Sequence, residues 1–291
     1  IQEGQWSYRG GPVKLYRGKK GRRWRQVNET LKTIERRTSL RRYKDVAIKE
    51  EDLELLLYAA QRAPTAGNMM LYSILLIRDQ HTKDVLSKTC DNQPFIAKAP
   101  LVMVFLADVQ RWFDYYRVSE VKEFCLRTGL EFRGPNLGDL FISVSDALIA
   151  AQNVVIAAES LGIGSCYIGD IMENYETHRE LLDLPEYVFP IAMLCLGYYP
   201  DDYKPIVRHR FEHQYFVFEE KYHRLNEEEL TAMFAQLEAS IPQPNKYGAE
   251  NAAQYTFARK TGAAFSCEMD RSIRKAMENW QGGNPLVDQH V

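Results

Sequence analysis

The sequence has few cysteines and no metal-binding spacing among them, and it carries almost no excess of charge of either sign. Its five cysteines are odd in number and widely spaced, and no two of them form a Cys-x-x-Cys pair. A disulfide scaffold, a zinc site and an iron–sulfur site are therefore not indicated. With 37 basic against 39 acidic residues, the whole chain has no net attraction to a polyanion. We expect no metal and no nucleic-acid partner.

Long apolar runs are also missing. No run approaches the roughly 20 residues that span a bilayer, and the N-terminal segment lacks the apolar core of a secretory signal. At 291 residues and 45% hydrophobic composition, the chain can still bury one large core or two small ones. We therefore expect a soluble, cytoplasmic protein with no membrane partner.

Residues 1–27 differ in character from the rest of the chain. Lysines, arginines and glycines gather there, and Glu3 is the only acid. The simplest expectation is a solvated basic arm outside the core. Two other interpretations stay open: a contact strip for an anionic partner or second subunit, and a translated ribosome-binding stretch ahead of a native start near Val27.

From residue 28 onward the hydrophobic pattern becomes that of a folded domain, which we expect to extend to residue 240. It predicts helices at about 49–62, 146–161 and 227–237, the second of them central, buried and ended by Gly162. It predicts buried strands at 71–77, 101–107 and 189–196 and a short strand at 215–218.

Two further segments are harder to assign. Residues 110–137 hold many aromatic side chains without a clean period, and we expect a lid or variable insert there. Residues 241–291 are expected as a C-terminal arm whose amphipathic helical segment, at about 250–280, packs on the core or on a partner subunit.

Several short segments have a composition suited to ligand binding. In Arg37-Thr38-Ser39-Leu40-Arg41, two guanidinium groups and two hydroxyls could surround a phosphate, although a helix N-cap with surface basic residues is the simpler explanation of this segment alone. The simplest interpretation of the loop at residues 63–68 is that it ends the preceding helix. Residues 165–169 form a helix-to-strand connection, or a turn whose small residues admit a flat ligand. Arg208 and Arg210 could bind the same phosphate, or they could be a pair of charged residues on an edge strand.

Taken together, these segments resemble the FMN-dependent nitroreductases, in particular their larger, NADPH-preferring subgroup. Residues 37–43 are similar to the family's opening phosphate signature, and residues 63–68 to its Ala-Pro-Ser/Thr loop beside the flavin. Residues 92–95 resemble the segment whose glutamine meets the isoalloxazine ring. Residues 146–164 resemble the central helix, 167–169 the turn that meets flavin N5, and 189–197 with 208–210 the strand and Lys-Pro-Arg element.

The resemblance implies a fold and a cofactor site. The fold is α+β, with a central mixed or antiparallel sheet surrounded by helices, in an intertwined homodimer whose two FMN sites are each built from both chains. No catalytic side chain and no metal are implied, because flavin N5 carries the hydride. The residues implied to bind FMN are Arg37, Thr38, Ser39, Arg41, Pro64, Thr65, Asn68, Gln93, Tyr167, Ile168, Gly169, Arg208 and Arg210.

The activity implied is that of an NAD(P)H oxidoreductase. It would reduce nitroaromatics, quinones or flavins by ping-pong hydride transfer, with NADPH or NADH as donor. Two alternatives stay open: a reductive dehalogenase of the same family, and a non-catalytic flavin-binding or regulatory module. The chain departs from the family pattern at Met70, where many members have glutamine, and at Arg208-His209, which replace Lys-Pro.

Overall fold

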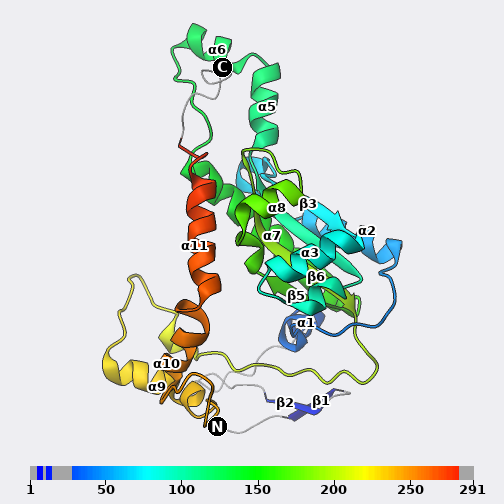
Figure 1. The fold of residues 1–291 in the computed structure, drawn as a ribbon, viewed down its shortest axis with the longest axis vertical. Helices are drawn as coiled ribbons and strands as arrows, with labels where there is room; N and C mark the ends of the chain where they lie inside the picture. Colours follow the sequence, from blue (N-terminus) through cyan, green and yellow to red (C-terminus); the bar gives the residue numbers. More distant parts are fainter. Residues whose placement is uncertain (1–4, 9–10, 15–27, 282–291) are drawn as a thin grey trace. The chain divides into compact units, whose positions relative to one another are not determined.

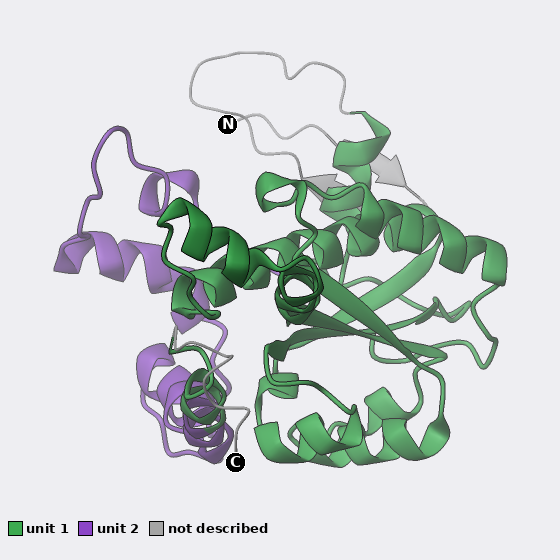
Figure 2. Ribbon diagram, turned by 90° about the horizontal axis from the view of Figure 1, so that it is seen from above, with its two compact units in different colours: residues 1–207, 272–291 green, residues 208–271 purple. Residues whose placement is uncertain are grey.

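The computed structural model describes residues 5–8, 11–14 and 28–281, and its contacts divide the chain into two compact units. The first unit contains the chain up to residue 207 together with residues from 272 onward, and the second contains residues 208–271 (Figure 2). The end of the chain thus belongs to the first unit, and the expected domain boundary at residue 240 stays a prediction. Of the expected basic arm, only two paired strands, β1 (Gln5–Tyr8) and β2 (Gly11–Lys14), are described.

A four-stranded antiparallel sheet forms the centre of the first unit (Figure 1). Its strands follow the order β3 (Tyr72–Ile77), β4 (Leu101–Asp108), β6 (Val188–Tyr198) and β5 (Ile163–Ile168). The strands predicted at 71–77, 101–107 and 189–196 are confirmed. Residues 165–169 were expected as a connection or a turn, but residues 163–168 pair with β6 and form an edge strand of the sheet.

Alternate side chains of β4 enter two different cores, as the period of a strand requires. On one face, Met103 and Phe105 pack with α2 (Glu50–Gln61) and α7 (Leu137–Ser160). On the other face, Val102 and Val104 pack with α3 (Gln80–Thr89), α4 (Pro94–Ala97) and the 3₁₀ turn η2 (Asp170–Met172). Both faces of the sheet are therefore covered by helices.

The central helix α7 is longer than the sequence pattern predicted. It begins at Leu137 because Asn136 and Asp139 form a capping box, in which each side chain accepts the other residue's backbone N–H. Gly162, with φ of 75°, follows its last turn as expected. By length and composition alone the helix could cross a membrane, contrary to expectation. However, 44% of its most apolar 18-residue stretch is buried inside the fold.

The expected lid forms two short helices, α5 (Gln110–Val118) and α6 (Val121–Thr128) (Figure 1). Few of their side chains are buried, so no core-facing stripe marks them in the sequence. Large apolar side chains that remain exposed here include Tyr115, Val118, Phe124 and Leu126. Residues 129–136 connect α6 to α7.

The second unit contains α9 (Glu227–Glu238), as predicted, and α10 (Ala252–Thr256), followed by a π-helical turn (Phe257–Thr261). The strand predicted at 215–218 is wrong, because these residues find no pairing strand in the described chain and Tyr215 ends a 3₁₀ turn, η3 (His213–Tyr215). Helix α11 (Ala264–Met277) ends on the first unit, where Ala276 and Trp280 are buried with Phe189. The tail therefore covers its own chain's core.

Candidate functional site

The turn at residues 37–41 lies beside the edge strand β5. The backbone N–H of Leu40 donates to the carbonyl of Ser165 at 2.9 Å, and Ser39 forms a parallel bridge with Ser165. Leu40 is fully buried, whereas Ser39 and Arg41 are exposed, because neighbouring side chains of an extended segment point to opposite sides. The predicted phosphate turn and the predicted flavin turn are thus neighbours in space.

Two arginines that flank this turn are already paired. The guanidinium of Arg36 donates to the carbonyl of Glu159 at 3.0 Å, and its Nε lies 3.4 Å from the Glu159 carboxylate. Arg42 forms an exposed ion pair with Asp202 at 2.9 Å. These contacts fix the ends of the turn to α7 and to the segment after β6.

The two arginines inside the turn are different. Among the residues that the structure describes, neither Arg37 nor Arg41 has a carboxylate partner. Both lie close enough to β5 to lower the pKa of the Cys166 thiol, although burial, the larger effect, raises it. Burial likewise raises the pKa of Tyr167 to about 12 against the opposing charge of Arg37. Arg41 also lies over the ring of Phe95, 5.7 Å from its centre.

Thr38 is buried, and its hydroxyl lies 2.8 Å from the hydroxyl of Tyr203. The ring of Tyr203 packs at a tilt against Tyr199, with 4.8 Å between the ring centres, and the Tyr199 hydroxyl donates to Glu159 at 2.7 Å. Thr38 therefore anchors the turn, and its hydroxyl already forms one hydrogen bond, to Tyr203. Sequence reasoning did not identify the two tyrosines or Glu159. Glu159 could have been noticed in the sequence, because a charged residue on the buried side of an apolar helix usually has a partner.

Gln93 joins this site through Asp170. Its amide Nε2 donates to the Asp170 carboxylate at 2.7 Å, and Asp170 directly follows Gly169. In the predicted flavin turn Ile168 is buried while Tyr167 and Gly169 are exposed. A Cβ placed on Gly169 would meet only Met172, at 3.9 Å, so the main chain here is not crowded by neighbouring side chains.

The loop at residues 63–68 is anchored elsewhere on α7. The N–H of Ala66 donates to the carboxylate of Asp146 at 2.9 Å, whereas the turn is tied to Glu159. At about 1.5 Å per residue, these two positions on α7 are roughly 20 Å apart along the helix. Pro64 and Asn68 are exposed, and the Thr65 hydroxyl accepts from Met70 N–H at 3.3 Å.

The remaining predicted residues, Arg208 and Arg210, belong to the second unit. Both are exposed, and they lie in no strand, so the edge-strand interpretation is wrong. Arg210 donates to the carbonyl of its neighbour His209 at 3.2 Å.

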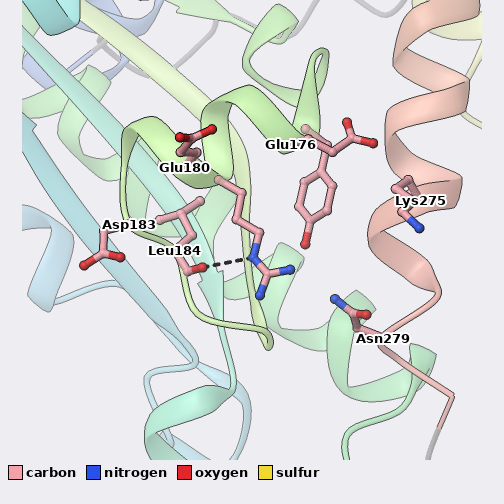
Figure 3. A pocket seen from close by; sticks show the side chains of 8 residues that line it. Glu176, Glu180, Asp183, Leu184, Lys275 and Asn279 are labelled. Carbon is pink, nitrogen blue, oxygen red and sulfur yellow. Dashed lines mark hydrogen bonds between the residues drawn. The ribbon is translucent and has the colours of Figure 1, made fainter.

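A separate hollow lies between α8 (Tyr175–Leu181) and the end of α11 (Figure 3). None of the predicted site residues lines it. Arg179 uses its Nε to donate to the carbonyl of Leu184 at 3.2 Å, and Lys275 pairs with Glu278 at 2.6 Å. Because the rest of the lining mixes carboxylates with these engaged cations, we do not assign the cofactor to it. The lining comprises Tyr175, Glu176, Arg179, Glu180, Asp183, Leu184, Lys275 and Asn279.

Comparison with known proteins identifies the family of this chain. The model of the Nitroreductase family matches residues 34–198. The chain is 35% identical over 172 residues to an FMN reductase (NADPH) of Bacillus subtilis strain 168, a match that spans 59% of this chain and 66% of that protein, just under two thirds. It is 31% identical over 208 residues to an FMN reductase [NAD(P)H] of the same organism, which spans 71% of this chain and 78% of that protein.

A solved structure with a similar fold is nitroreductase A of Vibrio parahaemolyticus, with a TM-score of 0.71 and 25% identity. The similarity covers 87% of this chain and 98% of that one. The α+β fold, the antiparallel sheet and the family match thus agree with one another, and the chain belongs to the nitroreductase family.

Proposed function

We propose that the chain is an FMN-dependent oxidoreductase that takes electrons from NAD(P)H and reduces small aromatic acceptors such as nitroaromatics, quinones or flavins. Family membership and the names of its relatives support the class of reaction. The structural observation that carries the proposal is the pair Arg37 and Arg41. These cations lie in the turn that bridges β5 at Ser165, Gly169 directly follows that strand, and among the described residues neither arginine has a carboxylate partner.

The donors of this site fit a group with a phosphate at one end and a flat ring at the other. Guanidinium groups bind phosphate through charge-assisted, often bidentate hydrogen bonds, and the exposed Ser39 adds a neutral donor. The backbone around Ile168 and Gly169 offers N–H groups for a ring that gains negative charge on reduction. Arg208 and Arg210 are proposed as further phosphate contacts, as the family resemblance implies.

Bound FMN would supply the hydride chemistry, and the chain supplies binding, orientation and charge. No side chain of the site has to move a proton. Because NAD(P)H and the acceptor would use one exposed ring face in turn, we expect ping-pong kinetics, seen as parallel lines when NADPH is varied at several fixed quinone concentrations.

We also propose that the enzyme is a homodimer. Helix α7 leaves five large side chains at least 39% exposed, spaced so that they share one face: Leu137, Phe141, Ile142, Leu148 and Ile149. A second copy packed on this stripe would bury it. The roughly 20 Å between the two anchor points on α7 supports the same conclusion, because the loop at residues 63–68 of one chain could then complete the site of the other.

All five cysteines are free thiols, which fits the reducing cytoplasm that we propose as the location of the protein. Cys90, Cys125, Cys166 and Cys195 are buried, and Cys267 is exposed.

The first test is the visible spectrum of the purified protein, before and after NADPH or NADH is added without oxygen. A yellow protein that bleaches promptly supports the proposed reaction and shows which donor is preferred. A yellow protein that stays oxidised with both donors favours a flavin-binding module. A colourless protein that also fails to take up added FMN overturns the proposal.

A further inference from the structure

The segment at residues 65–72, here called the flavin loop, is held at its base by one buried carboxylate. Asp146 of α7 is 3% exposed, and its two oxygens accept the N–H groups of Ala66 at 2.9 Å and Leu71 at 3.2 Å. One side chain thus binds both ends of the loop. Among the described residues no cation lies within ion-pair distance of Asp146, so the backbone N–H groups are what compensate its charge.

The same loop is also held by the first helix of the lid. In α5, the indole N–H of Trp112 donates to the carbonyl of Met69 at 2.8 Å. The guanidinium of Arg111 donates to the carbonyls of Met70 at 2.8 Å and Tyr72 at 2.6 Å. Arg111 is itself fixed by Asp108, 3.2 Å away at the end of β4.

These contacts hold a loop backbone that contains three residues with positive φ. Gly67, Asn68 and Met70 have positive φ of 55°, 57° and 51°. The left-handed region is unfavourable for an unbranched apolar residue such as methionine and persists only where the surroundings impose it. Strained backbone of this kind is characteristic of ligand-binding segments. The exposed tip of the loop is thus fixed in one conformation by groups at its base.

We propose that Asp146, together with Arg111 and Trp112, positions the flavin loop for FMN, and that these contacts couple the lid to the cofactor site. The inference rests on the proposed function, since it takes the loop to contact the flavin. A change in α5 would then be felt at the cofactor through the carbonyls of Met69 and Met70. Asp146 acts through the loop, so it is a positioning residue and not a catalytic one.

The test uses Asp146→Asn in the full-length protein. An amide presents an NH₂ group where one carboxylate oxygen stood, so one of the two loop N–H groups loses its acceptor. We expect the Kd for FMN, measured by quenching of flavin fluorescence, to rise at least about tenfold. We also expect the visible circular dichroism of the bound flavin to change, which a general loss of stability would not cause.

Asp139→Asn is the matched control. Asp139 is also a carboxylate of α7 that accepts a backbone N–H, but it caps the helix and does not touch the loop. We expect it to lower the melting temperature while leaving the Kd for FMN and the flavin dichroism unchanged. Wild-type affinity and dichroism in Asp146→Asn would overturn the role of Asp146. Failure of the wild-type protein to bind FMN would instead overturn the proposed function.

The lid contact is tested separately by Trp112→Phe, which keeps an aromatic ring and removes the N–H to Met69. We expect a rise of about threefold or more in the Kd for FMN, with the same change in dichroism. Tyr115→Phe, on an exposed side chain of the same helix, is expected to change neither. If Trp112→Phe equals wild type in both measurements, the coupling of lid and loop is refuted, whatever happens to Asp146→Asn.

Discussion

Gly164 of β5 lies directly against Leu40 of the predicted phosphate turn. A Cβ placed on Gly164 would come within 2.7 Å of the Leu40 Cβ and 2.9 Å of the Tyr199 ring, closer than real Cβ atoms approach other atoms. Leu40 is fully buried and hydrogen-bonded to the next residue of β5, so it has little freedom to retreat. The absence of a side chain at Gly164 is what lets the turn rest on the strand.

Gly164→Ala is therefore expected to destabilise the fold and displace the turn. Overpacking of a filled core costs about 1–3 kcal/mol, and the displaced Arg37 and Arg41 should bind FMN more weakly. Urea unfolding and an FMN titration measure the two effects. Gly169→Ala is the control for stability, since its Cβ would make only an ordinary van der Waals contact, 3.9 Å from the Met172 side chain. Unchanged unfolding of Gly164→Ala would show that the turn can move without cost.

Arg41→Ala is expected to weaken FMN binding by removing charge-assisted hydrogen bonds to the phosphate. At about 1.5–3 kcal/mol for each such bond, the Kd should rise about tenfold to a hundredfold. Arg42→Ala is the matched control, because the adjacent arginine is already paired with Asp202 at 2.9 Å. Equal effects of the two substitutions on FMN affinity would contradict the distinction between paired and unpaired arginines.

Stability is expected to fall as the pH drops below about 6.5 because of His178. Its ring is fully buried, with Nδ1 donating to the carbonyl of Ile171 at 2.9 Å and Nε2 2.7 Å from the Thr89 hydroxyl. Burial lowers the pKa of His178 below its ordinary value of 6.5, more than the bond to Ile171 raises it.

The sign follows from proton binding. Below its ordinary pKa the unfolded chain takes up a proton that the folded chain does not, so the contribution of neutral His178 is complete above 6.5 and is lost as the pH falls towards the lowered pKa. Unfolding in urea at about pH 7.5 and about pH 5.5 measures this loss. His178→Asn should make the pH dependence shallower, whereas the exposed His81→Asn should not.

Charged substitutions on the exposed stripe of α7 are expected to separate the proposed dimer. Phe141→Asp and Ile149→Asp would place a carboxylate in a dry interface, where an unpaired charge is costly. Light scattering should then show a monomer, with a parallel loss of bound FMN. Leu76→Asp, on an apolar side chain of β3 that is about as exposed as Ile149, is the control. A monomeric wild-type protein that retains FMN would refute the two-chain site.

The sequence pattern predicted well where burial is one-sided and local. β4 is apolar along its length, and α2 shows one apolar face, so both were placed within a residue of their observed bounds. The sequence pattern predicted secondary structure wrongly where a segment's conformation depends on a partner far away in the chain. Residues 163–168 become a strand only because β6 lies beside them, and residues 215–218 remain irregular because no described strand pairs with them. The helices of the lid bury too little surface to leave a period in the sequence.

The sequence by itself determined the family, the apolar core and the residue types at the phosphate turn, because these depend on local composition and spacing. Only the tertiary structure decided which arginines are available, since Arg36 and Arg37 are neighbours of one residue type and Arg36 alone is paired with Glu159. It also decided that Asp146 holds the flavin loop and that the tail buries Trp280 on the chain's own core. Such roles arise from contacts between residues far apart in the chain, which no local pattern records.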